Sequence, residues 1–577
     1  MPAASRSLAA PWWKRAVFYQ VYPRSFMDAN GAGVGDLQGL AHCLPYVADL
    51  GVDAVWLGPV MRSPMRDFGY DISDYCDIDP VFGTLDDFDA VVTEAHRLGL
   101  RLIVDQVWSH SSDRHPWFIE SAASRDNPRA DWYVWADARP DGTPPSNWQA
   151  SFGGAAWTWN PRRRQYYLHN FLSSQPDLNH HCPDVQDAML DVARFLLDRG
   201  VDGFRLDVVN YYVHDAALTD NPVADHVRTP AATIRFQRQV HNKSQPETLA
   251  FVARLRALLD GYDGERMAVG EIFDDDMVGR QLEYTDGPDR LHTAYSFVLL
   301  QAGRATPALF LGALAPWAQA AGWPSWSLGN HDVPRFPSRM APGGEPDPRL
   351  TRCLLAVLLS LRGTPFLYQG EELGLPQAEV PFERLRDPFA IAAWTGGREA
   401  AGRDGARTPM PWTDAEGGGF STATQTWLPL DPAHRPLSVE RQAADCGSTL
   451  SLVRRLLAAR RAASALQTGD LHPLPPPDGV LAFERTLGEE RFVCLFELAG
   501  RAVEVALPDD AEWVVVEGEG LTPDAAHPLS HPSDLIGGPL AGVRTVAEGP
   551  SGQAGGKRSV GLDPYGWAWL RAGAAAA

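Results

Sequence analysis

The 577-residue sequence is poor in several features that mark large classes of protein. It contains six cysteines and no CxxC pair, which argues against a disulfide framework and a zinc site and suits a reducing compartment. With 51 Lys and Arg against 72 Asp and Glu, its net charge of −21 disfavours nucleic acids and anionic membranes as partners. No apolar run is long enough to cross a bilayer, and the first residues lack the apolar core of a signal peptide. We therefore expect a cytoplasmic protein.

The patterns that are present alternate between strand-like and helix-like over most of the chain. Helically spaced apolar positions predict helices over 37–50, 88–98, 185–199 and 450–465. Short β-favouring runs separate them, at residues 16–22, 54–60, 101–107, 203–210, 267–273, 293–299, 326–328 and 365–369. This alternation predicts an α/β fold, most simply a (β/α)8 TIM barrel of parallel strands. A doubly wound open sheet is the alternative, but no GxGxxG or phosphate-binding loop follows any of these strands.

Two stretches break the alternation and divide the chain. Residues 108–181 are rich in Trp, Pro, Arg and Asn with little periodicity, so we expect an inserted subdomain after the third strand. The catalytic barrel would then comprise residues 1–107 and 182–472. After a proline-rich linker at 473–477, residues 478–577 alternate apolar and polar positions between turn signals. That pattern predicts a C-terminal β-sandwich domain.

Charged and polar residues cluster where the predicted strands end. In GFRLDVVN (203–210), Arg205 and Asp207 are two positions apart and therefore face the same side of a strand. A buried ion pair alone would explain one such pair. In a parallel barrel, however, the carboxyl ends of all the strands meet at one mouth. Those ends supply three carboxylates, two histidines and one arginine: Asp207, Glu271, Asp332, His110, His331 and Arg205.

This set of side chains favours glycoside cleavage over other hydrolytic chemistries. It holds no Ser or Cys nucleophile, and its histidines lack the HExxH spacing of metalloproteases. Like charges crowded in a cleft are unfavourable, and proteins keep them mainly where the charge is used. Cleavage of a glycosidic bond needs a carboxylate nucleophile, a carboxylic acid of raised pKa, and charge that stabilises an oxocarbenium-like transition state.

The residues around these positions form blocks that are recognisable together. In chain order they are QVYPRSF (20–26), SPMRDFGYDISDY (63–75), DQVWSH (105–110), QPDLN (175–179), GFRLD (203–207), GEIF (270–273), GNHD (329–332) and RTPMPW (407–412). With them the chain resembles, over nearly its whole length, the α-amylase family of glycoside hydrolases (family 13). Within that family it is similar to the α-glucosidase and oligo-1,6-glucosidase branch. The resemblance implies that the chemistry requires no cofactor.

By that resemblance, the carboxylates at the mouth divide the chemistry between them. Asp207 is the nucleophile that forms a covalent glucosyl-enzyme intermediate, and Glu271 is the general acid and then the base. Asp332 binds the 2- and 3-hydroxyls of the sugar and favours its distorted ring. Arg205 holds Asp207 ionised and oriented.

The same resemblance implies a sugar-binding set around the carboxylates. His110 and His331 would donate hydrogen bonds to hydroxyl groups of the sugar. Asp67, with Arg403 as its partner, would bind the 4- and 6-hydroxyls of the non-reducing end. Tyr70 would stack on the sugar ring, a face that aromatic side chains suit well.

Three further residues concern the pocket walls and the linkage that is cut. Phe152 and Phe171 of the inserted subdomain are candidate walls, with core packing of that subdomain as an equal alternative. Val208, next to the nucleophile, is typical of α-1,6 activity in this branch. The segment 211–249 instead resembles exo-acting enzymes that prefer short α-1,4 substrates, so the two indications conflict.

The loop DANGAGVGD at 28–36 is a candidate cation site. Its oxygen-bearing side chains alternate with glycines, a pattern that can surround a hard cation, and a plain glycine-rich turn is the alternative. The loop resembles the metal loop of the α-glucosidase branch, although Ala32 replaces its middle aspartate. Ser109 likewise replaces the asparagine that holds calcium in true amylases. A structural Ca²⁺ or Mg²⁺ ion would be held by Asp28, Asn30, the Val34 carbonyl and Asp36.

We therefore expect a retaining, exo-acting α-glucosidase that hydrolyses short α-glucosides of the maltose or isomaltose type and also transfers glucosyl groups. The nearest alternative is a sucrose hydrolase, sucrose isomerase or trehalose synthase on the same scaffold, because a sugar can replace water as the attacking group. A non-catalytic barrel protein that only binds is more distant, since the carboxylates are kept. The expected partner is a small oligosaccharide, with no nucleic acid and no membrane, and the expected assembly is a monomer or homodimer.

Overall fold

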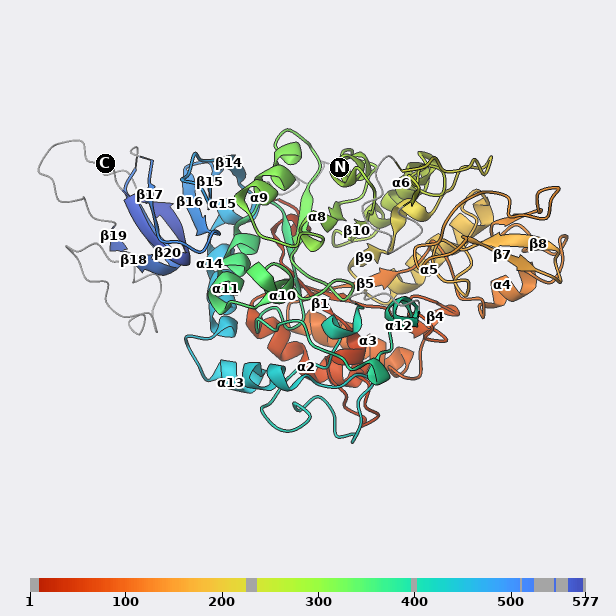
Figure 1. Ribbon diagram of the computed structural model, residues 1–577, viewed down its shortest axis with the longest axis horizontal. Coiled ribbons are helices and arrows are strands. Elements are labelled where there is room, and N and C mark those ends of the chain that lie inside the picture. The colour runs from red at the N-terminus through yellow and green to blue at the C-terminus, as the bar shows by residue number, and fades with distance from the viewer. Residues whose placement is uncertain are drawn as a thin grey trace, which may run out of the picture.

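Eight parallel strands close into a barrel in the middle of the molecule (Figure 1). The computed structural model describes residues 10–224, 236–395, 402–508, 511–522, 544–545 and 559–573. The strands follow one another around the barrel in chain order, each parallel to its neighbours. They are β1 (Phe18–Val21), β2 (Ala54–Leu57), β5 (Arg101–Gln106), β9 (Gly203–Leu206), β10 (Met267–Glu271), β11 (Thr293–Tyr295), β12 (Pro324–Ser327) and β13 (Thr364–Tyr368). The predicted (β/α)8 TIM barrel is confirmed.

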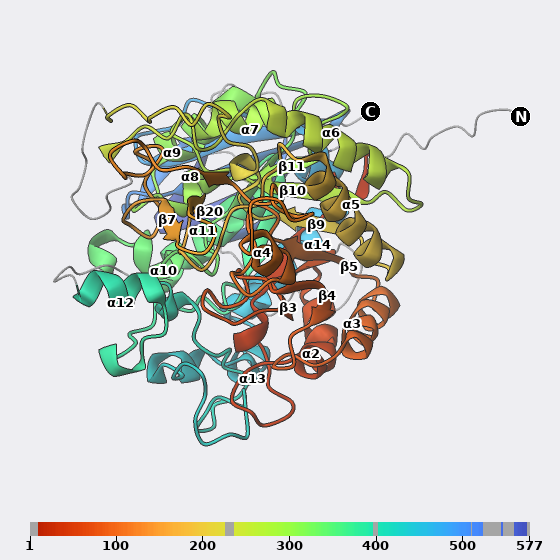
Figure 2. The same ribbon diagram turned by 90° about the vertical axis from the view of Figure 1, so that its right-hand side faces the viewer.

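Helices surround the barrel, and Figure 2 shows α2, α3, α5 and α6 along one side of it. In chain order the helices outside the inserted segment are α1 (Trp12–Arg15), α2 (Leu37–Leu50), α3 (Leu85–Arg97), α5 (Pro183–Asp198), α6 (Glu247–Asp260), α7 (Met277–Thr285), α8 (Phe297–Leu300), α9 (Pro307–Leu314), α10 (Phe336–Arg339), α11 (Pro348–Ser360), α12 (Pro388–Thr395), α13 (Val439–Ala443), α14 (Thr449–Ala462) and α15 (Ser464–Thr468). Local sequence sets their ends. Helix α2 begins after Asp36, whose carboxylate accepts the Gly39 N–H (2.6 Å), and ends at Gly51 with a φ of 94°.

Two elements differ at their ends from the sequence-based expectation. The strand expected over 203–210 stops at Leu206, and the chain turns into a short 3-10 helix, η2 (Val209–Tyr211). The helix expected over 450–465 is two helices, α14 and α15, because the backbone of Ala463 between them is extended. Periodicity alone does not register such turns, because the apolar spacing continues across them.

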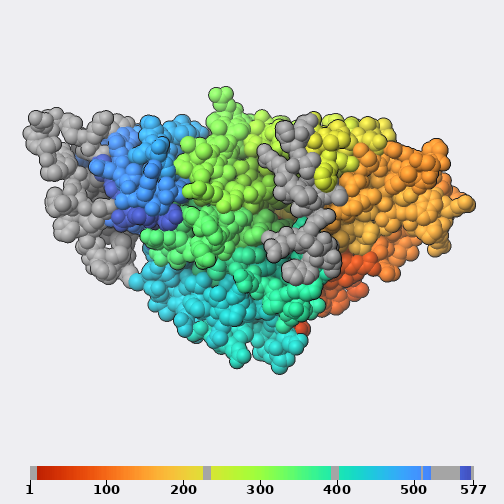
Figure 3. Space-filling model, in the orientation of Figure 1, coloured from red at the N-terminus to blue at the C-terminus, as the bar shows by residue number. Residues whose placement is uncertain are grey.

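Short strands after β2 and β5 stand outside the barrel. Between β5 and α5, a three-stranded antiparallel sheet in the order β6, β8, β7 lies within the stretch expected to be an inserted subdomain. Buried Trp148, Trp157 and Leu168 form part of the apolar cluster beneath it. In Figure 3 this segment is the orange end of the molecule. The elements are β3 (Met61–Arg62), β4 (Asp74–Ile78), α4 (Pro116–Ser121), β6 (Trp135–Ala136), β7 (Trp157–Asn160) and β8 (Gln165–Leu168).

The C-terminal residues form an antiparallel all-β domain at the opposite end of the molecule, blue in Figure 3. Its strands are β14 (Asp470–Pro473), β15 (Val480–Leu487), β16 (Glu490–Glu497), β17 (Val503–Ala506), β18 (Trp513–Thr522), β19 (Arg544–Thr545) and β20 (Ser559–Ala572). One face of the sheet, with Phe483, Phe496 and Trp567, joins the same apolar core as α11 and α14. Val493 and Leu562 belong to a separate apolar cluster. The predicted all-β C-terminal domain is confirmed.

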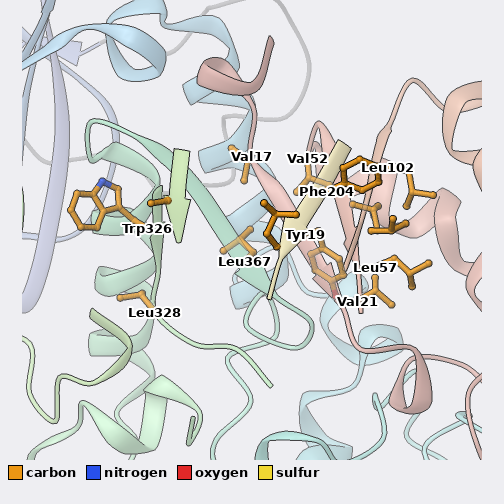
Figure 4. Packing of buried hydrophobic residues seen from close by; sticks show 14 of the residues in the cluster. Val17, Tyr19, Val21, Val52, Leu57, Leu102, Phe204, Trp326, Leu328 and Leu367 are labelled. Atoms are coloured by element: carbon orange, nitrogen blue, oxygen red, sulfur yellow. The ribbon is translucent and has the colours of Figure 1, made fainter. Parts of the chain in front are cut away.

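The barrel interior is filled with apolar and aromatic side chains beneath the polar mouth. Because side chains alternate along a strand, Phe18 and Phe366 point inward, where their rings stack 4.6 Å apart with Trp56 beside them. Tyr19 and Leu102 belong to the other core cluster, shown in Figure 4, which the surrounding helices share. The packed interior leaves the strand ends as the working surface. No helix in the described ranges is both long and apolar enough to cross a membrane.

The loop at 28–36 satisfies its side-chain oxygens from its own backbone. Asp28 accepts a hydrogen bond from the Gly33 N–H (2.7 Å), and Asp36 accepts one from the Asn30 N–H (3.1 Å). Across the part of the chain that the structure describes, no three His, Cys, Asp or Glu side chains are grouped as a metal site would require. The carboxylates of this loop thus already take part in hydrogen bonds, and the Ca²⁺ or Mg²⁺ ion stays a prediction.

Chelation tests this loop directly. Because its carboxylates already accept N–H hydrogen bonds, we expect EDTA treatment followed by CaCl₂ addition to move Tm by less than about 1 °C in scanning calorimetry. A rise of several degrees with CaCl₂ that Asp28→Asn removes would establish the cation site instead.

Candidate active site

The register of three neighbouring strands brings one arginine and three carboxylates together inside the barrel mouth. Strands β5 and β9 pair Asp105 with Arg205, and β9 and β10 pair Arg205 with Val269. Two residues further along each strand, Asp207 is therefore level with Glu271. The Arg205 guanidinium donates hydrogen bonds to all three carboxylates, at 2.8 Å to Asp105, at 2.7 Å to Asp207, and to Glu271. Arg205 is thus the common partner of three buried carboxylates, not of Asp207 alone.

Burial shifts the proton equilibria of the two facing carboxylates. Desolvation raises the pKa of Asp207 well above its ordinary value, while Arg205 opposes the shift and Glu271 adds to it. Desolvation also raises the pKa of Glu271, again against Arg205. Both carboxyl groups therefore lose their protons at higher pH than a free carboxylic acid does.

Asp332, in the loop after β12, is the third carboxylate of the predicted set. Arg407 donates a hydrogen bond to it at 2.7 Å, and Arg403 lies 3.5 Å away. Burial acts to raise the pKa of Asp332, but the positive charges of Arg407 and Arg403 hold it below its ordinary value. Its side chain is 28 % exposed, against 10 % and 8 % for the other two carboxylates of the set. The site therefore opens to solvent at an ionised Asp332.

His331 and Tyr70 form a hydrogen-bonded stack at the mouth. Nδ1 of His331 accepts the Gln20 side-chain N–H (2.7 Å), so the proton is on Nε2, which donates to the Tyr70 hydroxyl (2.7 Å). That hydroxyl donates in turn to Asp105 (3.0 Å). The two rings are 5.5 Å apart with 2° between their planes. Burial lowers the pKa of His331 to about 3, so its imidazole is neutral near pH 7.

Asp67 and Arg403 are joined by a hydrogen bond of 2.8 Å, although they are far apart in sequence. Arg403 also donates to Asp387 (2.8 Å), and Gln175 donates to the second Asp67 oxygen (3.1 Å). Both carboxylates are buried. Because Arg403 also lies 3.5 Å from Asp332, this ion-pair network reaches the carboxylates at the mouth.

His110 and the two phenylalanines lie against these groups. Nε2 of His110 is 2.9 Å from the Tyr70 carbonyl, which only accepts, so this nitrogen carries the proton. Burial lowers the pKa of His110 to about 4. The Phe171 ring is 5.1 Å from His110, and the Phe152 ring is 5.4 Å from the Arg403 guanidinium. Neither phenylalanine belongs to the cluster beneath the small sheet, so core packing there does not account for them.

Val208 follows the end of β9 in an uncommon backbone conformation. Its φ of 37° and ψ of 49° are left-handed, a region that β-branched residues rarely adopt. Its N–H donates to the Glu271 carboxylate at 3.1 Å. Val208 thus contacts the predicted general acid through its backbone, and its part in choosing the linkage stays a prediction, as do the other roles assigned to these side chains from the sequence.

Five residues of this network have no role assigned from the sequence: Gln20, Asp105, Gln175, Asp387 and Arg407. Four of them lie in the sequence blocks at 20–26, 105–110, 175–179 and 407–412, and membership of a block was the available signal. Asp387 lies in none of the blocks, and only its contact with Arg403 reveals it.

Comparisons with known proteins agree with this geometry. Residues 20–469 match the α-amylase catalytic domain family. A Rhizobium meliloti (strain 1021) protein named "Probable alpha-glucosidase" is 49 % identical over 521 residues, or 88 % of this chain and 94 % of that protein. The oligo-1,6-glucosidase of Parageobacillus thermoglucosidasius is 34 % identical over 532 residues, or 86 % of this chain and 92 % of that protein. The crystal structure of an alpha-glucosyl transfer enzyme, XgtA, is 44 % identical with a TM-score of 0.86, over 98 % of this chain and 100 % of that one.

The family match covers most of the chain, and both relatives align along most of their own length. The matched stretch carries the barrel, its mouth and the three predicted catalytic carboxylates. This chain therefore belongs to the α-amylase family of glycoside hydrolases.

Proposed function

We propose that this chain is a retaining, exo-acting α-glucosidase that releases glucose from the non-reducing end of short α-glucosides. The observation that carries the proposal is the pair of Asp207 and Glu271, both hydrogen-bonded to the Arg205 guanidinium inside the barrel mouth. A retaining glycosidase needs two carboxyl groups close together, one as nucleophile and one as acid, and this pair can take both roles. The relatives named alpha-glucosidase and oligo-1,6-glucosidase support the same activity.

The geometry suggests how the reaction proceeds. Asp207 attacks the anomeric carbon while Glu271 donates its proton to the leaving oxygen, which gives a covalent glucosyl-Asp207 and a free sugar. Glu271, now ionised, takes a proton from water, and the resulting hydroxide displaces Asp207. Arg205 stays bonded to both groups, so the negative charge that moves between them always faces a cation. Asp332, held ionised, faces the developing positive charge of the sugar ring.

The ion pair of Asp67 and Arg403 supports exo action on short substrates. A buried carboxylate and a guanidinium together can bind two neighbouring hydroxyl groups, such as those of a terminal glucose. Because Arg403 is also fixed by Asp387, these donors are held in place before any sugar arrives. A polymer running through the site in both directions would have to displace this network.

Transfer of glucosyl groups to sugars is a second activity that we propose for the same site. The similarity to XgtA, whose structure is described as that of an alpha-glucosyl transfer enzyme, favours it. The covalent intermediate is common to both outcomes, and only the attacking group differs.

We also propose a cytoplasmic location and a monomeric or homodimeric assembly. All six cysteines are free thiols, which supports a reducing compartment. Two-fold dimers are the commonest assemblies of soluble proteins, and light scattering after size exclusion measures this one.

Replacing the general acid tests the mechanism. For Glu271→Gln we expect kcat/KM on maltose to fall about 10²- to 10⁴-fold, because the leaving sugar then departs without a proton. With an aryl glucoside that has a good leaving group, the rate of the first step, formation of the glucosyl-enzyme, should fall much less in Glu271→Gln. Glu283→Gln, on the exposed surface of α7, is the matched control. Unchanged release of glucose from maltose by Glu271→Gln would rule out this assignment.

Replacing Arg403, the cation of the Asp67–Arg403 ion pair, tests whether this pair binds the non-reducing end of the substrate. For Arg403→Ala we expect a rise in KM of about tenfold or more for maltose, because Asp67 and Asp387 lose their shared partner. For Arg403→Lys we expect a KM between those of the parent protein and Arg403→Ala, since lysine keeps the positive charge but lacks the planar guanidinium group. Arg384→Ala is the control, because among the described residues the Arg384 side chain donates to a backbone carbonyl outside this network, that of Thr426. A KM for Arg403→Ala equal to that of the parent protein would contradict the proposal.

The effect of Val208 on linkage preference is measured by the ratio of kcat/KM for isomaltose to kcat/KM for maltose. We expect Val208→Ala to lower kcat/KM for isomaltose relative to maltose by about tenfold, the usual effect of small apolar changes in a pocket. Product analysis on maltose, isomaltose, sucrose and trehalose also separates water from sugar as acceptor. If this ratio is the same in Val208→Ala and the parent protein, Val208 does not determine the linkage preference. If sugar-transfer products form without release of glucose, the enzyme is a transferase and not a hydrolase.

A further inference from the structure

A cavity of about 360 Å³ lies at the end of the barrel opposite the active site. Its walls come from residues just before β1 and β2, from the start of β5, and from α1, α14 and α15. The predicted catalytic carboxylates lie instead at or just after the last residues of their strands. Val17, labelled in Figure 4 just before β1, is one of its lining residues. Its size falls in the range of small-molecule pockets, which is about 300 to 1,000 Å³. We call it the basal cavity.

Positive charge dominates the lining of the basal cavity. Four arginines face it, against one carboxylate among the lining residues, that of Asp53: Arg15, Arg101, Arg460 and Arg461. This is unusual in a chain whose net charge is −21, where an acidic wall would be the default. Asp53 is already used, because it accepts the Val17 N–H (2.8 Å) and a hydrogen bond from Arg461 (3.1 Å).

Two of the four arginines lack a carboxylate partner. Arg101 is paired with Asp202 (2.7 Å), and Arg461 with the lining carboxylate. For Arg15 and Arg460, the described residues contain no carboxylate within ion-pair distance. Among the described residues, the lining therefore carries more positive charge than its paired carboxylates balance.

Arg460 is the buried member of the cluster and carries the argument furthest. It is 1 % exposed, and its Nη groups donate to backbone carbonyls, including those of Leu359 (3.0 Å) and Gly363 (3.2 Å). Its Nε is buried without a hydrogen-bond partner among the described residues. Burial lowers the pKa of Arg460 to about 10, which still leaves it charged near pH 7. A buried guanidinium without a counter-ion is unfavourable unless an anion comes close to it.

A purely structural role explains only part of this arrangement. The carbonyl bonds of Arg460 tie α14 to the connection between α11 and β13, and a tie of this kind needs no cavity. It also does not explain why exposed Arg15 and Arg461 line the same space. Several guanidinium groups around one pocket are the arrangement that recognises phosphate oxygens, since each offers planar, directed donors.

We propose that the basal cavity binds a small phosphate-bearing molecule, either inorganic phosphate or the phosphoryl group of a small ester. The anion balances Arg15 and Arg460 and bridges the starts of the strands to α14. It binds the folded protein only, so it raises the stability of the fold. The site is separate from the one that cleaves glycosidic bonds and needs no step of that reaction.

Calorimetry and thermal unfolding test this proposal with named probes. In HEPES buffer at constant ionic strength, set with NaCl, we expect millimolar inorganic phosphate or glucose 6-phosphate to raise Tm by about 2 °C, and glucose to have no such effect. Equal shifts from the two anions assign the site to phosphate itself, and a larger shift from the ester assigns it to the ester. Isothermal titration gives the two affinities.

Two variants and one control decide whether the basal cavity is the place of binding. Arg15→Ala and Arg461→Ala should each weaken phosphate binding about tenfold, because each removes a charged hydrogen-bond donor. Arg114→Ala, on the exposed surface outside the cavity, should bind like the parent protein. Circular dichroism and unchanged kcat/KM on maltose confirm that each variant is folded. The proposal is overturned if neither anion shifts Tm beyond NaCl, or if the Arg15→Ala shift equals that of the parent.

Discussion

One guanidinium group organises the mouth of this barrel. Arg205 is fully buried, stacks near Trp56 at 5.0 Å, and binds carboxylates that come from three neighbouring strands. A buried charge of this kind is unfavourable alone, and so are the carboxylates. Together they compensate each other, and burial still raises the pKa values of Asp207 and Glu271. Stability of the mouth and readiness for acid–base chemistry therefore depend on the same hydrogen bonds.

Aromatic packing in the barrel supports this arrangement from below and from the side. Stacked Phe18 and Phe366 fill the interior below it, and the stack of Tyr70 on His331 stands beside it. Neutral imidazoles suit this role, because a second cation so close would compete with Arg205 for the carboxylates. The active site is thus the polar top layer of an otherwise apolar core.

Much of this could be predicted from the sequence, and the exceptions have physical causes. Strand identity followed from short β-favouring runs, and the predicted carboxylates followed from where those runs end. The left-handed turn at Val208 could not be foreseen, because valine disfavours that conformation and only the surrounding contacts impose it. Asp387 escaped notice because its importance lies in a contact with Arg403, and no local pattern encodes that contact. At the 28–36 loop, the spacing of oxygen-bearing residues could not show that Asp28 and Asp36 accept backbone N–H hydrogen bonds.

None of the described residues of the C-terminal sheet belongs to the hydrogen-bonded network of the active site, but the sheet does not stand apart from the barrel. Phe483, Phe496 and Trp567 share one continuous apolar core with Leu354 and Leu457 of the barrel helices. Separating the two parts would expose that core to water, which strongly disfavours either part alone. One shared apolar core therefore holds the sheet against the barrel helices, so the rigidity of the barrel depends in part on residues far from its mouth.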